Sequence, residues 1–253
     1  MKFTVVIPAR YGSSRFPGKP LADIAGKPMI VWVAERALQS GASEVLVATD
    51  HADIAAAVEG YGFTAVMTRR SHASGTDRIA EVAVRRRFPA RRIVVNVQGD
   101  EPLIDPRLIA RVAENLAAHV DADIATACTP IRDARDFSSS NIVKVVLDRD
   151  GYALYFSRAP IPFARDAFAR GIRELPRGLS AFRHLGIYAY RCAFLKRFAR
   201  LPGAAIERYE ALEQLRALAN GCRISVAVTH RAPHAGIDTP RDLRRLRRLV
   251  RRK

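Results

Sequence analysis

Short apolar runs alternate with amphipathic segments through the first half of this 253-residue chain. The runs cover residues 3–7, 44–49, 63–67, 93–97 and 123–129. Continuous apolar runs of this length are typical of strands that are buried on both faces of a parallel sheet. The segments between them repeat apolar residues at helical spacing, and Asp105 followed by proline marks the start of one helix. This alternation predicts an α/β fold with a doubly wound, mostly parallel sheet that binds ligands at the carboxyl ends of its strands.

The alternation stops near residue 130. Residues 142–147 and 152–156 flank the turn sequence Asp-Arg-Asp-Gly and predict a β-hairpin. Residues 163–180 are polar and contain glycine, which predicts an irregular surface segment. Later expected elements are strands at 184–190 and 223–229 and one continuous amphipathic helix at 206–219. We therefore expect a single domain over residues 1–253 with a β-rich insertion at about 130–205.

The first apolar run leads into a basic loop, Ile-Pro-Ala-Arg-Tyr-Gly-Ser-Ser-Arg-Phe-Pro-Gly-Lys-Pro-Leu, at residues 7–21. Arg10, Arg15 and Lys19 supply positive charge, and two glycines let the backbone approach ligand oxygens closely. The spacing matches neither a Walker A loop nor a GxGxxG dinucleotide fingerprint. A strand followed by a basic, glycine-containing loop and a helix predicts a polyphosphate-binding site. A solvated basic turn is the simpler alternative.

Two acidic loops are candidates for a metal site. Gln-Gly-Asp-Glu-Pro at residues 98–102 follows the fourth apolar run, and Asp238 precedes a helix start at Thr239. Adjacent carboxylates in a chain point in different directions, so we assign the metal to Asp100 rather than Glu101, with Asp238 facing it. Mg²⁺ prefers oxygen ligands, usually one or two carboxylates together with substrate phosphates. An ordinary acidic turn and a helix-terminus charge are the simpler interpretations.

The formal charge of +17 comes from 42 Lys and Arg residues against 25 Asp and Glu residues. An arginine-rich stretch at residues 244–253 carries leucines at helical spacing, which predicts an amphipathic terminal helix with a basic outer face. Aromatic residues are not interleaved with the cationic clusters, as a groove for single-stranded nucleic acid would require. We therefore interpret the charge as a solvated surface and expect no nucleic-acid partner.

Three dispersed cysteines, Cys128, Cys192 and Cys222, suggest neither a disulfide framework nor a zinc site and favour a reducing compartment. The first apolar run is short and ends at Pro8, which is unlike a signal peptide. No apolar run approaches the roughly 20 residues needed to span a bilayer, so we expect no membrane insertion. Together these features predict a cytoplasmic location.

Several longer motifs resemble one enzyme family. They are the loop at 7–21, His-Ala-Ser-Gly-Thr-Asp-Arg-Ile-Ala-Glu at 72–81, Asn-Val-Gln-Gly-Asp-Glu-Pro at 96–102, Tyr-Phe-Ser-Arg-Ala-Pro-Ile-Pro at 155–162, His-Leu-Gly-Ile-Tyr-Ala-Tyr-Arg at 184–191, Leu-Glu-Gln-Leu-Arg at 212–216 and Gly-Ile-Asp-Thr-Pro-Arg-Asp-Leu at 236–243. In this order they resemble the 3-deoxy-manno-octulosonate (Kdo) cytidylyltransferases, a branch of the sugar nucleotidyltransferases. The resemblance implies transfer of CMP from CTP to the anomeric hydroxyl of Kdo, which gives CMP-Kdo and pyrophosphate and activates Kdo for lipopolysaccharide synthesis. It also implies a Mg²⁺ cofactor and a homodimer.

The same resemblance implies a role for individual residues. The implied catalytic residues are Arg10, Arg15, Lys19, Asp100 and Asp238, of which the two aspartates would hold Mg²⁺. The implied nucleotide-binding residues are Ala9, Arg10, Lys19, Ser74, Gly75, Arg78 and Gln98. The implied sugar-binding residues are Gln98, Arg158, His184, Tyr188, Glu213 and Gln214. On the residues alone, the simpler interpretations are favoured: Ser74 as a helix cap, His184 as a structural histidine and Glu213 as an exposed helix charge.

Three alternatives stay open at the level of the sequence. Within the same class, the acceptor would be another sugar acid such as sialic acid, or the donor would be UTP. From a different class, the charge would mark a basic nucleic-acid-binding protein, whose affinity for unrelated DNA would be sensitive to salt. The third alternative is a degenerate binding module without catalysis, which the presence of both acidic loops and all three loop cations argues against.

Overall fold

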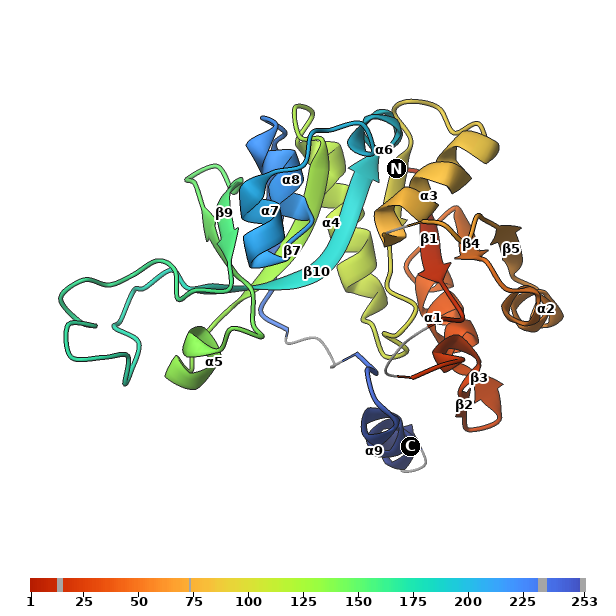
Figure 1. Cartoon of the computed structure of the whole chain (residues 1–253), viewed down its shortest axis with the longest axis horizontal. Helices are drawn as coiled ribbons and strands as arrows, with labels where there is room; N and C mark the ends of the chain where they lie inside the picture. Colours follow the sequence, from red (N-terminus) through yellow and green to blue (C-terminus); the bar gives the residue numbers. More distant parts are fainter. Residues whose placement is uncertain (13–15, 73, 232–235, 251–253) are drawn as a thin grey trace.

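A computed structural model describes residues 1–12, 16–72, 74–231 and 236–250, and a nine-stranded mixed sheet forms the centre of this described part (Figure 1). The main strands are β1 (Phe3–Ala9), β4 (Glu44–Thr49), β5 (Thr64–Met67), β6 (Ile93–Asn96), β7 (Ile124–Pro130), β10 (Phe182–Arg191) and β11 (Ile224–Val228). Their order is β11-β7-β10-β6-β1-β4-β5. All neighbours pair in parallel except β10, which lies antiparallel between β6 and β7. The predicted α/β fold with a mostly parallel sheet is confirmed.

Helices cover both faces of the sheet, and their positions explain why the strands read as continuous apolar runs. The helices are α1 (Met29–Leu38), α2 (Ala52–Gly60), α3 (Gly75–Arg85), α4 (Pro106–Ala118), α5 (Ala134–Ser138), α6 (Cys192–Phe198), α7 (Ala205–Glu210), α8 (Gln214–Ala219) and α9 (Pro240–Val250). Within β1, Val5 and Ile7 pack into the core beneath α1 and α4, whereas Val6 packs into the core beneath α3 and α6. Both sides of the strand are therefore buried, as in a doubly wound sheet.

The strand register brings two loops together at one edge of the sheet. Strand β1 runs parallel to β6, with Val6 opposite Asn96, so the basic loop after β1 and the acidic loop after β6 emerge side by side. Gly99 lies where they approach most closely. A Cβ atom there would lie 3.1 Å from the carbonyl oxygen of Pro8, which explains the glycine between Gln98 and Asp100.

The segment after β7 forms an arm that extends away from the seven main strands of the sheet (Figure 1). It contains α5 and the predicted hairpin, β8 (Lys144–Leu147) and β9 (Ala153–Ser157), and it has a small apolar core that includes Phe137 and Phe168. Strand β10 and helix α6 also fall within residues 130–205, but they return to the main body of the fold. The boundaries of the expected insertion stay a prediction.

The expected continuous helix at 206–219 is wrong. Helix α7 ends at Glu210 and α8 begins at Gln214, because Ala211 adopts a left-handed conformation with a φ of 50°. Leu212 is buried immediately after the break. The change of direction turns Glu210 toward β9 and Glu213 toward α3, where each meets a hydrogen-bond partner.

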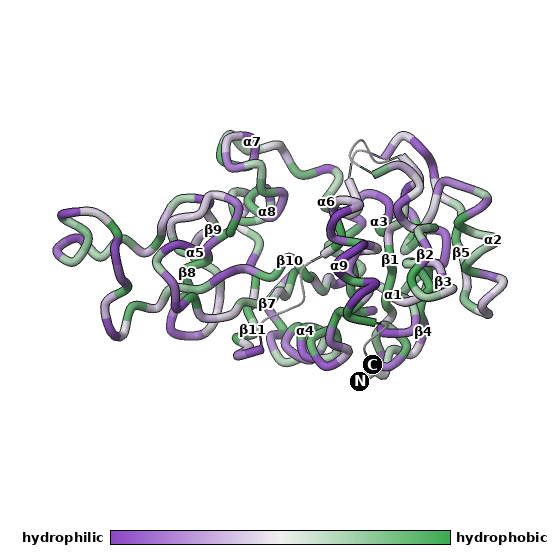
Figure 2. The backbone as a smooth tube through the Cα atoms, turned by 90° about the horizontal axis from the view of Figure 1, so that it is seen from below, coloured by the Kyte–Doolittle hydropathy of each residue, from purple (hydrophilic) through white to green (hydrophobic). Residues whose placement is uncertain are grey.

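The last helix, α9, is amphipathic as expected. Leu243 and Leu246 are buried against Ile24 and Met29, the residues that lead from the small β2 (Asp23–Ile24) and β3 (Lys27–Pro28) pair into α1. Leu249, expected on the same face, is instead 48% exposed. Figure 2 shows α9 as largely hydrophilic outside this contact. Among the helices of the described ranges, none combines the length and apolar character that crossing a membrane would require.

The N-cap of α4 offers a test of local helix stability. Asp105 Oδ1 accepts a hydrogen bond of 2.9 Å from the backbone N–H of Arg107, and Pro106 begins the helix. Asp105→Ala is expected to lower the free energy of unfolding by about 1 kcal/mol, because the cap is lost. Asp105→Asn should stay close to the parent protein, since asparagine caps as well as aspartate. Urea denaturation of both variants measures the difference, and equal losses in the two would contradict the capping role.

Candidate functional site

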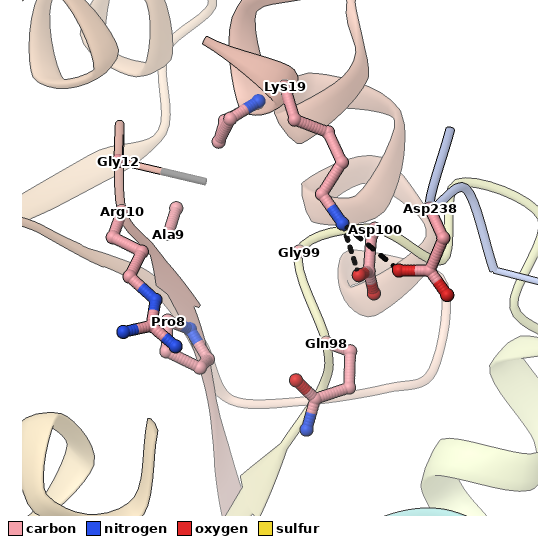
Figure 3. A pocket seen from close by; sticks show the side chains of 10 residues that line it. Pro8, Ala9, Arg10, Gly12, Lys19, Gln98, Gly99, Asp100 and Asp238 are labelled. Atoms are coloured by element: carbon pink, nitrogen blue, oxygen red, sulfur yellow. Dashed lines mark hydrogen bonds and ion pairs between the residues drawn. The ribbon is translucent and has the colours of Figure 1, made fainter. Parts of the chain in front are cut away.

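A cavity of about 410 Å³ opens where the basic and acidic loops meet (Figure 3). Its lining comes from β1 and the loop after it, from the loop after β6, and from the segment before α9. The lining residues are Pro8, Ala9, Arg10, Gly12, Lys19, Pro20, Gln98, Gly99, Asp100 and Asp238. Sequence motifs that lie more than 200 residues apart thus form one wall, at the carboxyl ends of parallel strands where such folds bind ligands.

Lys19 lies at the centre of the charged groups in this cavity. Its Nζ is 2.6 Å from Asp100 Oδ2 and 3.8 Å from Asp238 Oδ1, so one ammonium group faces both carboxylates (Figure 3). The backbone supports this arrangement, because the N–H of Ile237 donates a 2.9 Å hydrogen bond to the carbonyl oxygen of Asp100. The prediction that the two acidic loops face each other therefore agrees with the geometry.

Glu101, the neighbour of Asp100, is a buried carboxyl with a raised pKa. Burial, together with the charge of Asp100, raises the pKa of the Glu101 carboxyl to about 8. At neutral pH Glu101 therefore mostly carries its proton. This distinction agrees with the choice of Asp100, rather than Glu101, as the member of the pair that interacts with cations.

The donor set fits a hard divalent cation that is shared with a substrate. No group of three or more His, Cys, Asp or Glu side chains within the described ranges is arranged to hold a metal ion. Asp100 and Asp238 are two carboxylates facing one position, and Mg²⁺ is commonly held by one or two carboxylates and by substrate phosphates. The position is compatible with a cation, since the ammonium group of Lys19 already lies there.

A smaller cavity of about 100 Å³ adjoins the first and shares Pro8, Arg10 and Gln98 with it. Its other lining residues are His72, Ser74, Gly75 and Arg78, at the start of α3. Ser74 Oγ accepts a 3.1 Å hydrogen bond from the backbone N–H of Asp77, which confirms the predicted helix cap. The seven predicted nucleotide-binding residues thus line two adjoining cavities. Arg15, which was predicted as a catalytic residue, lies outside the described residues.

Arg78 is buried, and its guanidinium already has partners. It is 3% exposed, forms a 2.9 Å ion pair with Asp50 and donates to the hydroxyl of Thr68. Asp50 also accepts from the backbone N–H of Tyr11 at 3.4 Å, so it connects the basic loop to α3. The sequence analysis missed Asp50, although its position directly after the second apolar run, at the carboxyl end of β4, was an available signal.

The predicted sugar-binding residues of β10 flank a bulge. The pairing register shifts between His184 and Tyr188, yet their rings remain neighbours, with centroids 5.3 Å apart. His184 Nε2 is 2.8 Å from the hydroxyl of Thr126, and burial lowers the pKa of His184 to about 3. His184 is therefore neutral at physiological pH. It can take part in hydrogen bonds but cannot supply a positive charge to an anionic ligand.

Arg158 lies against the broken helix at α7. Its Nε donates to the carbonyl oxygen of Glu210 at 2.7 Å, and its backbone N–H donates to Glu210 Oε2 at 2.9 Å. Lys144, which is fully buried, donates to the carbonyl oxygen of Arg158 at 2.5 Å. The contacts of Arg158 with Lys144 and Glu210 could not be predicted, because the three residues meet only through tertiary packing.

Glu213 and Gln214 lie at the start of α8. Glu213 is half-buried, and its Oε2 accepts a 2.8 Å hydrogen bond from the hydroxyl of Thr76 in α3. Gln214 is 7% exposed, and its Nε2 has no hydrogen-bond partner among the described residues. A buried donor without a partner is costly, so this amide is suited to receive a polar ligand group. The assignment of Glu213 and Gln214 to an acceptor pocket stays a prediction.

Known proteins match this chain over nearly its whole length. The family model described as cytidylyltransferase matches residues 4–224. A 3-deoxy-manno-octulosonate cytidylyltransferase of Nitrosococcus oceani is 52% identical over 99% of this chain and 97% of its own. A protein of the same name from Pseudomonas fluorescens is 56% identical over 98% of both chains.

Solved structures agree. The structure titled CMP:2-keto-3-deoxy-manno-octonic acid synthetase complexed with CTP has a TM-score of 0.90 and 43% identity, covering 100% of this chain and 99% of its own. A cytidylyltransferase of Leptospira borgpetersenii, at 16% identity and a TM-score of 0.61 over 100% of this chain and 87% of its own, shares the fold. The high-identity matches include the segments that carry the cavity residues.

Proposed function

The chain belongs to the cytidylyltransferase family, and from this premise we propose that it transfers CMP from CTP to the anomeric hydroxyl of Kdo, giving CMP-Kdo and pyrophosphate. The main structural support for this proposal is the cavity in which Lys19 faces Asp100 and Asp238. A cationic loop beside a pair of carboxylates suits a triphosphate and its counterion. Two Kdo cytidylyltransferases match nearly the whole chain at 52% and 56% identity, and this supports Kdo as the acceptor. It favours neither another sugar acid nor a nucleic-acid-binding protein.

The reaction is an in-line displacement at phosphorus. The anomeric hydroxyl of Kdo loses its proton to water as its oxygen forms a bond to the α-phosphorus. The bond from the α-phosphorus to the oxygen that bridges it to the β-phosphorus breaks, and pyrophosphate leaves with that oxygen. The main obstacle is charge, because an anionic sugar acid must approach a polyphosphate. Arg10 and Lys19, which line the cavity from the basic loop, hold phosphate oxygens and reduce this repulsion. Catalysis rests on positioning and electrostatics.

We further propose that Asp100 and Asp238 hold Mg²⁺ together with the phosphates of CTP. The support is the pair of facing carboxylates at the mouth of a polyphosphate cavity. When bound, the ion supplies positive charge to the phosphate oxygens of the donor. Lys19 then exchanges its contact with Asp100 for one with phosphate.

The acceptor side of the site is proposed to contain Gln98, Arg158, His184, Tyr188, Glu213 and Gln214. Strand register supports this grouping, because Tyr188 pairs with Asn96, two residues before Gln98 of the nucleotide cavity. Gln214 Nε2, which has no hydrogen-bond partner within the described ranges, and the neutral ring of His184 suit hydroxyl groups of a sugar better than they suit a second phosphate.

A homodimer in the cytoplasm completes the proposal. Leu154, Phe163 and Tyr209 are 60%, 60% and 89% exposed, and they lie on the arm and on neighbouring α7, where a second copy would cover them. The three cysteines are buried and form no disulfide, which agrees with a reducing compartment. Sedimentation of the purified protein tests the dimer.

Pyrophosphate release tests the reaction itself. With CTP and Mg²⁺, release is expected only when Kdo is added, and N-acetylneuraminic acid in its place should give little. UTP in place of CTP checks the donor. If pyrophosphate is released with another sugar acid but not with Kdo, the protein is a nucleotidyltransferase but Kdo is not its acceptor. A folded protein that releases nothing with any acceptor would contradict the proposed function.

A further inference from the structure

Thr76 joins the predicted nucleotide segment to the predicted acceptor segment. It follows Gly75, which lines the smaller cavity, and its side chain is turned away from solvent, with 2% exposure. Its hydroxyl donates a 2.8 Å hydrogen bond to Glu213 Oε2, across 137 positions of the sequence. Hydrogen bonds to an ionised acceptor are stronger than neutral ones, so this contact is well suited to fix the carboxylate.

The groups around this contact are aromatic and buried. The rings of Tyr188 and Tyr190 are stacked with centroids 5.8 Å apart, and Tyr190 is 5% exposed. Burial raises the pKa of the Tyr190 phenol, and the charge of Glu213 raises it further, while side-chain hydrogen bonds with Thr76 and Asn96 act in the opposite direction. Thr76, Glu213 and Tyr190 therefore form one polar group within a largely apolar layer.

A second connection joins the same two segments. Arg216 forms a 2.5 Å ion pair with Glu207, and its pKa is raised first by the hydrogen bond to Glu207, with smaller contributions from the charges of Glu213 and Asp77. Asp77 is the residue after Thr76 in α3. The guanidinium of Arg216, which is held by Glu207 of α7, is thus attracted to carboxylates at the start of both α3 and α8.

We propose that Thr76 is a positioning residue that orients the carboxylate of Glu213 in the acceptor pocket, from the end of α3 that borders the nucleotide cavity. The proposal rests on the proposed function, because it takes CTP and Kdo as the two ligands. Gly75 faces the nucleotide cavity, and the hydroxyl of the next residue holds Glu213. When the start of α3 is ordered beside the nucleotide cavity, Thr76 therefore holds the Glu213 carboxylate in one orientation toward Kdo.

The test is Thr76→Val, which keeps the shape of the side chain and removes the hydroxyl. The KM for Kdo is expected to rise roughly tenfold, because a hydrogen bond to a charged group is lost, while the KM for CTP changes less than about twofold. Thr76→Ser, which restores a hydroxyl, should bring the KM for Kdo back toward the parent value. Thr4→Val is the matched control, because Thr4 is equally buried but its hydroxyl has no hydrogen-bond partner among the described residues.

The outcomes separate this inference from the proposed function. If the parent enzyme releases no pyrophosphate with Kdo, the proposed function itself is rejected. If the parent is active and Thr76→Val leaves the KM for Kdo unchanged, or raises both KM values together, the positioning role of Thr76 is rejected. Circular dichroism checks that each variant is folded. If Thr76→Val does not fold, Thr76→Ala replaces it, with the same expected result: a higher KM for Kdo and a nearly unchanged KM for CTP.

Discussion

Asp100→Asn is expected to lower kcat by roughly 100-fold or more, because the neutral amide cannot supply the charge that holds a divalent cation against the triphosphate. Asn keeps the size of the side chain and one oxygen, so the loop after β6 should keep its shape. The contact with Lys19, at 2.6 Å, loses its ionic character in the same variant. Steady-state kinetics across a Mg²⁺ titration measure both the fall in kcat and the increased metal requirement.

Asp105→Asn is a matched control for this prediction. It makes the same chemical change five positions along the chain, at an N-cap whose function asparagine retains. Its kcat and Mg²⁺ requirement should stay within about twofold of the parent, since surface charge changes away from a site have small effects. If Asp100→Asn retained full activity with Mg²⁺, the assignment of the metal to Asp100 would be wrong.

Much of the fold was predictable because its signals are local. A continuous apolar run predicts each buried strand. Ser74 and Asp105 are N-caps, as the short-range spacing of residues around each helix start predicts. The convergence of the basic and acidic loops was predictable for a related reason. Residues at the carboxyl ends of parallel strands converge, so Arg10 and Asp100 could be placed at one edge without knowing any contact between them.

The misses arose where tertiary contacts overrule local preference. Residues 206–219 have helical periodicity, yet Ala211 takes a left-handed conformation that local propensity disfavours. The break allows Glu210 to accept from Ser157 at 2.5 Å and Glu213 to accept from Thr76 at 2.8 Å. Neither partner lies within 50 residues, so no sequence window contained the information.

The same limit applies to individual site residues. The resemblance places Arg78 near the nucleotide, and Arg78 does line the smaller cavity, but the sequence did not indicate that its guanidinium pairs with Asp50. A single chain shows which residue types are present but not which charges already neutralise one another. Lys19 is the informative case, because its partners, Asp100 and Asp238, belong to the very loops that were expected to bind the metal.

Lys19→Met is therefore expected to have opposite effects on the two ligands of the cavity. The KM for CTP should rise at least about tenfold, with kcat/KM falling by about 100-fold, because a charge-assisted hydrogen bond to phosphate is lost. Binding of a divalent cation to the free protein should instead become tighter. In the parent protein the ammonium group lies 2.6 Å from Asp100 and competes with any cation for that carboxylate.

Mn²⁺ binding to the nucleotide-free protein, followed by electron paramagnetic resonance, measures the second effect independently of turnover. Lys27→Met is the control, since Lys27 also forms a short ion pair, 2.5 Å from Glu35, but lies outside the cavity. Weaker Mn²⁺ binding in Lys19→Met would show that Lys19 does not compete for the carboxylates. The parent arrangement predicts that CTP and a divalent cation bind cooperatively. Phosphate would draw the ammonium group of Lys19 away from Asp100, which would free the carboxylates for the ion.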